Sequence, residues 1–139
     1  MEIRIIPMSN DDATFVGKSI EEVQKDFFEG SLVTEEKGWY YYAQTGLEAL
    51  EGDLLLFQMN NSIIASGTLD TVINFSKPTI DGNYGAYVLK VNTIKTFKPI
   101  SKEELKEMIN KFDSFNQTKQ KFNSKEVDLK KLNERMNTK

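Results

Sequence analysis

The 139-residue chain contains no cysteine and no histidine, and these two absences exclude several kinds of chemistry. Without cysteine there is no disulfide, no thiolate nucleophile and no cysteine-ligated zinc site. Without histidine the chain lacks the commonest metal ligand and the side chain that titrates near neutral pH. Ser-His-Asp, Cys-His and His-Asn-His catalysis are therefore excluded. Because no Asp/Glu cluster follows an apolar strand, we expect no metal and no cofactor, and a binding protein rather than an enzyme.

Long apolar runs are also missing. No stretch approaches the roughly 18 consecutive apolar residues that span a bilayer. The first residues, MEIRIIPMSNDD, lack the basic region and apolar core of a signal peptide. We therefore expect a cytoplasmic protein. The length is that of one ordinary domain.

Charge is unevenly distributed along the chain. Residues 1–97 carry 7 basic and 14 acidic side chains, a net charge of −7, whereas residues 98–139 carry 11 basic and 7 acidic side chains, a net charge of +4. One interpretation is an ordinary solvated face on C-terminal helices. The other is a local basic face that contacts phosphates, although the overall net charge of −3 argues against strong non-specific binding of nucleic acid.

Periodicity and turn residues predict an α+β domain. Two capping boxes, Ser19–Glu22 and Ser101–Glu104, begin helices, and Gly30 is expected to end the first. We expect a mostly antiparallel, partly closed β-barrel of five to six strands with flanking helices. Residues 1–112 would form this domain, and residues 113–139 a polar connector and a C-terminal helix that packs on the barrel or leads to a further domain. The expected strands are residues 2–6, 38–46, 53–60, 62–75 and 86–97, with Pro99 ending the sheet.

Four local patterns refine these strands. The unbroken run Leu54–Phe57 predicts a strand that is buried on both faces. Asn60-Asn61 is typical of a hairpin turn, and Gly67 indicates a bulge or a close backbone approach. In the run 39–42, Trp39 and Tyr41 must point to one side of a strand and Tyr40 and Tyr42 to the other.

These patterns together resemble the PUA-like superfamily, and within it the EVE-type domains. The similarity lies in Gly38-Trp39-Tyr40-Tyr41-Tyr42, then Gly52-Asp53 before the apolar strand, then Ser62–Gly67 and a strand ending in Ile94–Ser101. The order is also similar to the domain that precedes a His-Asn-His nuclease domain in some bacterial restriction-type proteins. The EVE-type start and its arginine-asparagine motif are absent here.

The resemblance implies a module that holds a modified or flipped-out base in an aromatic pocket. It implies a role in restriction or defence, with nucleic acid, chiefly modified DNA, as the partner and any nuclease in a partner protein or another domain. Reading a flipped base needs aromatic faces for stacking and polar groups for the base edge. The predicted base-binding residues are Trp39, Tyr40, Tyr41, Asp53, Phe57 and Ser66, and the predicted phosphate contacts are Lys119, Lys121 and Gln117.

Plainer interpretations exist for the same residues. Trp39 fits a core position as well as a cage, and Asp53 in Gly-Asp fits a turn. Residues 115–122 fit an exposed connector anchored by two phenylalanines. The alternative functions are a protein-interaction module, marked by an apolar patch without a basic rim, an RNA-binding PUA-like domain, and an enzyme that uses two carboxylates in a deep pocket.

Overall fold

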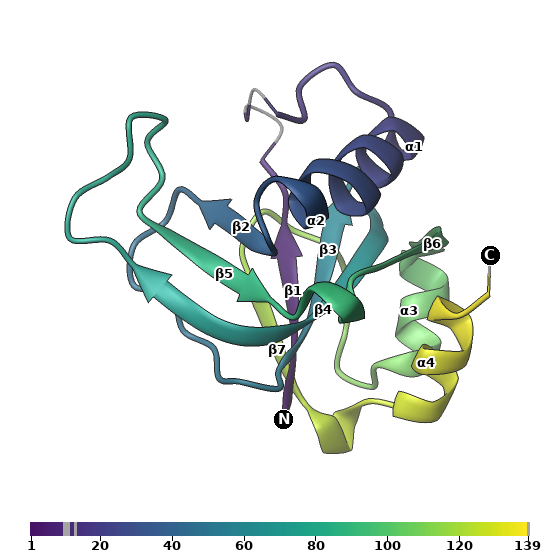
Figure 1. Ribbon diagram of the computed structural model, residues 1–139. Coiled ribbons are helices and arrows are strands. Elements are labelled where there is room, and N and C mark those ends of the chain that lie inside the picture. Colours follow the sequence, from purple (N-terminus) through teal and green to yellow (C-terminus); the bar gives the residue numbers. More distant parts are fainter. Residues whose placement is uncertain (10–11, 13, 139) are drawn as a thin grey trace.

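Seven strands pair into one sheet in the computed structural model, which describes residues 1–9, 12 and 14–138 (Figure 1). The strand order is β2-β5-β4-β3-β1-β7, and β6 pairs with β4. Only β1 and β3 pair in parallel; the other pairings are antiparallel. The strands are β1 (Glu2–Pro7), β2 (Trp39–Tyr42), β3 (Leu54–Met59), β4 (Ser62–Asn74), β5 (Gly85–Leu89), β6 (Lys95–Ser101) and β7 (Gln120–Asn123).

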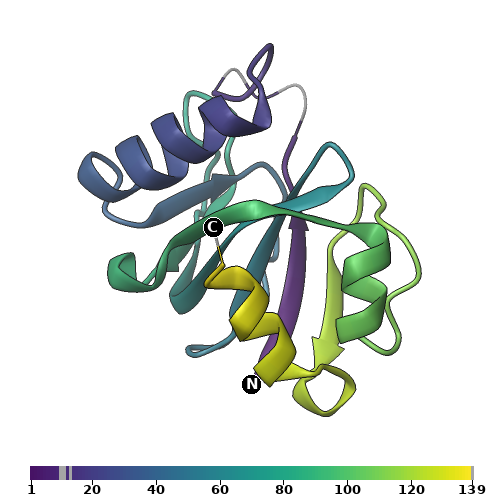
Figure 2. The ribbon, with the colours of Figure 1, turned by 90° about the vertical axis from the view of Figure 1, so that its right-hand side faces the viewer.

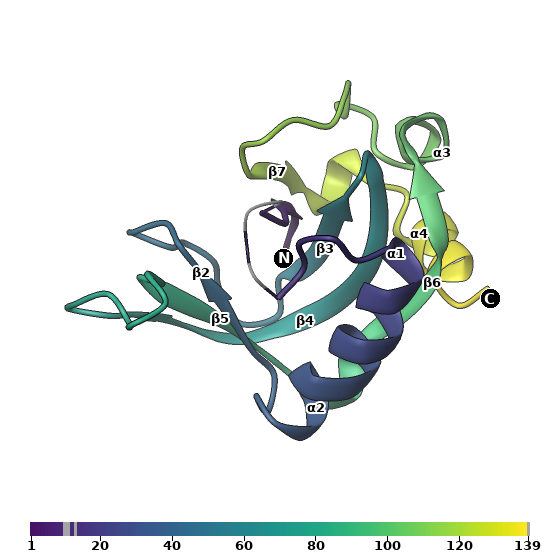
Figure 3. The ribbon, with the colours of Figure 1, turned by 90° about the horizontal axis from the view of Figure 1, so that it is seen from above.

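The sheet is open. Among the described residues, β2 and β7 do not pair with each other and so leave two edges. The α+β class and the mostly antiparallel sheet are confirmed. The expected partly closed barrel and its five to six strands are wrong, because the long strand β4 pairs with β3 and β6 in its first half and with β5 in its second half, so the sheet diverges into two arms (Figure 3).

Helices cover this sheet from two directions (Figure 2). A first helix begins as α1 (Ile20–Glu22), widens into the π-helical segment η1 (Val23–Ser31) and ends as α2 (Leu32–Thr34). Helices α3 (Lys102–Met108) and α4 (Leu129–Met136) lie together on the other side. Short 3-10 turns occupy Val91–Thr93 and Ser124–Glu126. No helix in the described part of the chain is long and apolar enough to cross a membrane.

Strand β3 separates two apolar clusters. Leu55 and Phe57 pack into the cluster beneath the first helix, whereas Leu56 packs into the cluster beneath α3 and α4. All three side chains have 0% exposure, so the prediction of a strand buried on both faces is confirmed. Asn60 and Asn61 follow it with φ angles of 49° and 61°, the left-handed pair of a tight hairpin turn, which is also confirmed.

Both predicted capping boxes are present. Ser19 and Ser101 each accept a hydrogen bond from the backbone N–H three residues later, and Glu22 and Glu104 return the contact. The prediction that Gly30 ends the first helix is wrong, because the helix continues through Gly30 to Thr34. Phe28 before Gly30 and Leu32 after it are both buried, and this burial stabilises the helix across the glycine. The chain instead reverses at Gly38.

Gly38 requires the absence of a side chain. Its φ is +89°, and a Cβ there would meet the backbone carbonyl oxygen of Leu89. Its N–H donates to Leu32 O at 2.8 Å and its carbonyl accepts from Leu89 N at 2.8 Å. This glycine therefore ends the helix and aligns β2 with β5.

The strand predicted at residues 86–97 is two strands. β5 and β6 pair with different parts of β4, and Pro99 lies within β6 rather than after the sheet. The turn between them is fixed by the Thr93 hydroxyl, which donates to Lys90 O at 2.6 Å and accepts from Thr68 N at 2.9 Å. Gly67 marks a close approach, since a Cβ would lie 3.1 Å from the Leu89 side chain.

The C-terminal residues belong to the same sheet and core. Strand β7, which the sequence interpretation did not include, pairs antiparallel with β1. Leu132 and Met136 of α4 are buried in the cluster that also contains Leu105 of α3. Arg135 donates to Glu104 at 2.7 Å and to Pro99 O at 3.1 Å, which ties α4 to α3 and β6.

Candidate nucleic-acid interface

A groove of about 1270 Å³ lies along strand β2. Its walls come from β2, the first helix, the segment after β1 and the loop between β4 and β5. The lining includes three of the predicted base-binding residues and one predicted phosphate contact, namely Trp39, Tyr40, Tyr41 and Gln117. The structure therefore brings together part of the predicted site at an edge strand.

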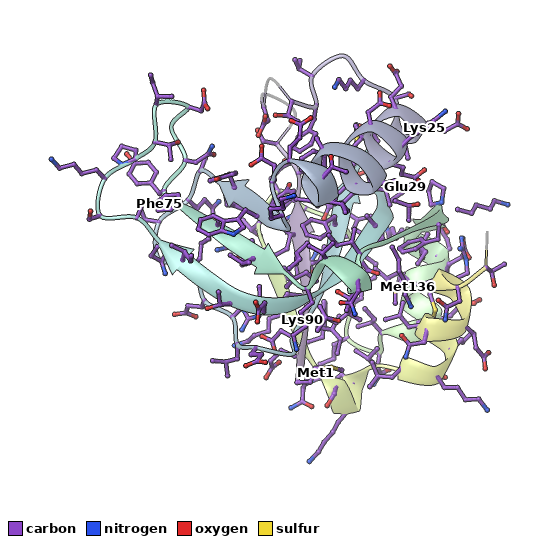
Figure 4. The ribbon with its side chains drawn as sticks, viewed as in Figure 1. Met1, Lys25, Glu29, Phe75, Lys90 and Met136 are labelled. Carbon is purple, nitrogen blue, oxygen red and sulfur yellow. The ribbon has the colours of Figure 1, made fainter. Side chains whose placement is uncertain are left out.

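The aromatic side chains of β2 alternate as predicted. Trp39 and Tyr41 contact each other with ring centroids 6.2 Å apart, and Tyr40 and Tyr42 are 6.5 Å apart. Trp39 is half-buried and Tyr41 is 37% exposed, so both present ring surface to a ligand. Tyr41 also contacts Phe75, which lies in the projecting β4–β5 arm (Figure 4).

Tyr40 serves chiefly as the floor of the groove. It is only 4% exposed and packs against Phe28 and Phe57 at centroid distances of 6.5 and 4.7 Å. Burial is the main reason that the pKa of its hydroxyl is raised well above the ordinary value. Phe15 stacks on the same ring at 6.4 Å and lines the groove as well.

The charged side chains described in the groove lining are acidic. Asp12, Glu35, Glu36 and Asp81 line it, whereas none of its described lining residues is lysine or arginine. Carboxylates accept hydrogen bonds and attract positive charge, so this lining favours amino groups over phosphate oxygens.

Basic residues lie instead in an adjoining pocket of about 220 Å³. Its lining includes Arg4, Lys119 and Lys121, with Glu48 as the acidic member. Lys119 connects the two sites, because its Nζ lies 5.5 Å from the ring centroid of Tyr42, and Tyr42 lines the groove. The predicted phosphate contacts Lys119 and Lys121 thus lie beside the aromatic groove, while Gln117 lies in it.

The other three predicted base-binding residues line neither site. Phe57 and Ser66 are 0% and 1% exposed and line neither the groove nor the basic pocket. Asp53 is 2% exposed and accepts hydrogen bonds from the N–H groups of Glu2 and Leu50 and from Arg4 Nε at 3.0 Å. Burial opposes its ionisation, but these bonds and the Arg4 charge outweigh burial and lower the pKa of Asp53. Its geometry is that of a turn and strand anchor.

Sequence reasoning missed several members of the site. Phe15 and the acidic residues come from loops or helix ends with no periodic pattern. Arg4 and Tyr87 line the same pocket although β3 and β4 lie between β1 and β5 in the sheet, so only the folded structure brings the two residues together. For Tyr42 the sequence did contain a signal. The alternation in β2 places its ring on the opposite side of the strand from Trp39, together with Tyr40. Within the described residues there is no group of three or more acidic side chains placed to hold a metal ion.

These features define a mixed α+β domain with a ligand-sized groove beside an edge strand. No protein-family model and no curated protein matches the chain. Among solved structures, one titled "Crystal structure of ASCH from Zymomonas mobilis" is similar with a TM-score of 0.57 and 14% sequence identity, over 98% of this chain and 96% of that one. At this identity the likeness shows the fold alone, so the fold of this chain is ASCH-like. The resemblance to EVE-type domains and the association with a nuclease stay predictions.

Proposed function

We propose that this protein is a non-catalytic module that binds nucleic acid by holding an unpaired base in the groove beside β2. One observation carries the proposal: Trp39 and Tyr41 present ring surface inside the groove, and Tyr42 connects it to Lys119 of the basic pocket. A nucleotide has the same two parts, an aromatic base and a phosphate. The ASCH-like fold and the resemblance of the sequence to PUA-like domains support this proposal by analogy.

The lining indicates how the ligand would lie. The base would stack on Trp39 or Tyr41, and its amino groups would donate to the carboxylates of the groove. The backbone would leave the groove toward Lys119 and Lys121, because the charged residues described in the groove lining are acidic and would repel phosphates. The groove volume of about 1270 Å³ exceeds the roughly 300–1,000 Å³ of sites for drug-sized ligands, so more than one nucleotide has room.

The finer form of the proposal is recognition of a modified base in DNA, linked to restriction or defence in the cell. An acidic, aromatic-walled groove supports preference for bases that carry added amino groups or positive charge. The restriction link rests on the sequence resemblance.

The single tryptophan gives a direct test. Titration with single-stranded DNA and RNA, with and without methylated and hydroxymethylated bases, should quench Trp39 fluorescence as a base stacks on it. Trp39→Ala should weaken binding of a labelled oligonucleotide about 10- to 100-fold, because stacking contributes about 1–3 kcal/mol per base. Trp39→Phe should weaken it less. Tyr84→Phe changes an exposed tyrosine that lines neither site and serves as the control. Unchanged affinity in Trp39→Ala would contradict the proposal.

The acidic lining favours one second candidate, a module that binds a basic segment of another protein. The absence of lysine and arginine from the described groove lining is the observation behind it. A lysine- and arginine-rich peptide that quenches Trp39 more strongly than any oligonucleotide, with affinity falling as salt is raised, would favour this candidate over nucleic acid.

A further inference from the structure

The basic pocket contains a buried hydroxyl with no hydrogen-bond partner. Tyr87 lines the pocket from β5 with 0% exposure, and its hydroxyl is unpaired among the described residues. Its ring packs edge to face against the ring of Tyr42, with centroids 5.8 Å apart, and burial is the main cause that raises its pKa, so the hydroxyl stays protonated at neutral pH. A protonated hydroxyl in this setting is a donor without an acceptor, which is costly unless a ligand supplies one.

Arg4 adds donors at the same place. Its Nε donates to Asp53 at 3.0 Å, whereas neither Nη has a hydrogen bond to any described residue. Asp53 therefore fixes the guanidinium from one side and leaves the other nitrogens free for a ligand. A fixed guanidinium fork matches the oxygens of a phosphate group.

Lys119 completes the set from the segment before β7. Burial, and then the charge of Arg4, lowers the pKa of its ammonium, while Glu48 acts in the opposite direction. Arg4 and Lys119 thus line one small pocket, and the exposed carboxylate of Glu48 offsets their positive charge only in part. An anion between them would relieve their mutual repulsion.

We infer that the pocket formed by Arg4, Tyr87, Lys119 and Lys121 is a binding site for the oxyanion of a phosphate group. Its volume of about 220 Å³ is below that of drug-sized ligand sites and suits a small anion. The inference deepens the proposed function, on which it rests for the source of the phosphate, a nucleotide whose base occupies the neighbouring groove. The three cations come from β1 and the β7 segment, and the hydroxyl comes from β5, so the site requires the assembled sheet.

Binding requires one side chain to move. The Tyr87 oxygen is covered, so an anion reaches it only after a lining side chain shifts. Lys119 has the freedom to make this shift, because its side chain is long, half-buried and packed over the face of Tyr42. When an anion binds, the Lys119 ammonium would leave the face of the Tyr42 ring and contact the anion instead.

The first test uses inorganic phosphate alone, titrated into the full chain and followed by NMR at constant ionic strength with chloride as the reference. The Tyr87 ring and Arg4 guanidinium signals should shift and saturate. Lys119→Gln should weaken the affinity about tenfold and Tyr87→Phe about fivefold. Glu48→Gln should strengthen it about twofold, a gain that misfolding does not produce. Lys102→Gln and Tyr84→Phe, which line neither site, should leave it unchanged. Equal phosphate affinity in wild type, Lys119→Gln and Tyr87→Phe would overturn the inference.

The second test compares deoxycytidine, whose base carries an amino group, inorganic phosphate, and a deoxycytidine dinucleotide with one internal phosphate. A dinucleotide that binds more tightly than either part, and is weakened by both Trp39→Ala and Lys119→Gln, supports a nucleic-acid source. Phosphate binding without tighter dinucleotide binding supports the anion site and counts against the proposed function. Dinucleotide binding that is weakened by Trp39→Ala but unaffected by Lys119→Gln and Tyr87→Phe overturns the anion site and leaves the proposed function standing.

Discussion

Replacing Asp53 with asparagine separates a structural role from a ligand role for this residue. The carboxylate accepts hydrogen bonds from Glu2 N, Leu50 N and Arg4 Nε at 2.9–3.0 Å and is only 2% exposed. Asparagine keeps the size but removes the charge that strengthens these three bonds, and it leaves Arg4 without a counter-ion. We expect Asp53→Asn to lower the free energy of unfolding by about 2–4 kcal/mol, and the melting temperature by about 10 °C.

The effect should depend on pH in a defined direction. The folded-state pKa of Asp53 is lowered, so its stabilisation is present above the unfolded-state pKa of about 3.9. It is lost as the pH falls through the folded-state value. The difference in stability between wild type and Asp53→Asn should therefore be full at pH 7 and disappear in strong acid.

Urea denaturation followed by circular dichroism measures this difference at several pH values. Asp70→Asn, at an exposed position on β4, is the matched control and should change stability by less than about 0.5 kcal/mol. An Asp53→Asn protein as stable as wild type at pH 7, but with impaired oligonucleotide binding, would refute the structural role. It would instead favour the base-edge contact predicted from the sequence.

Three further substitutions test the fold. Gly38→Ala should cost about 2 kcal/mol or more, because its φ is +89° and the new methyl group meets the carbonyl of β5; Gly46→Ala, with φ of +64° but open space, should cost less in the same thermal melt. Leu132→Ala should cost about 2–5 kcal/mol in urea denaturation, since this side chain of α4 is fully buried; a change below 0.5 kcal/mol would show that α4 is not part of the core. Arg135→Gln should cost at most about 1 kcal/mol, because Glu104 is part exposed, and should raise the pKa of Glu104 toward its ordinary value in an NMR titration.

The parts of the fold that the sequence predicts are those in which neighbouring residues determine the structure. The capping boxes, the Asn60-Asn61 turn and the two-faced strand at Leu54–Phe57 each depend on a few consecutive side chains, and all are confirmed. The interrupted strand at residues 86–97 was missed because the break depends on the Thr93 hydroxyl reaching Thr68, a contact between segments distant in sequence. Strand β7 was missed because its stability comes from pairing with β1.

The candidate site divides in the same way. Trp39 and Tyr41 were found because four consecutive aromatics are visible in the sequence, and the period of a strand places these two together. The sequence did not identify Arg4 and Tyr87 as pocket residues. Each is a single residue in a strand, and its neighbours in the sequence give no sign of a pocket. Asp53 was assigned to the ligand because a Gly-Asp turn does not reveal that Arg4 lies beside it.

The pairing of β1 with β7 has a consequence for how the chain folds. Residues 2–5 must pair with residues 120–123, so this pairing joins segments that lie more than a hundred residues apart in the sequence. Folds dominated by such distant contacts fold slowly, because the entropy of closing a long loop is lost before the contact forms. During synthesis on the ribosome, β1 would emerge more than a hundred residues before β7 and keep an unpaired edge until β7 followed. Residues 120–123 therefore decide both when the sheet is complete and how long its first strand is open to pairing with another molecule.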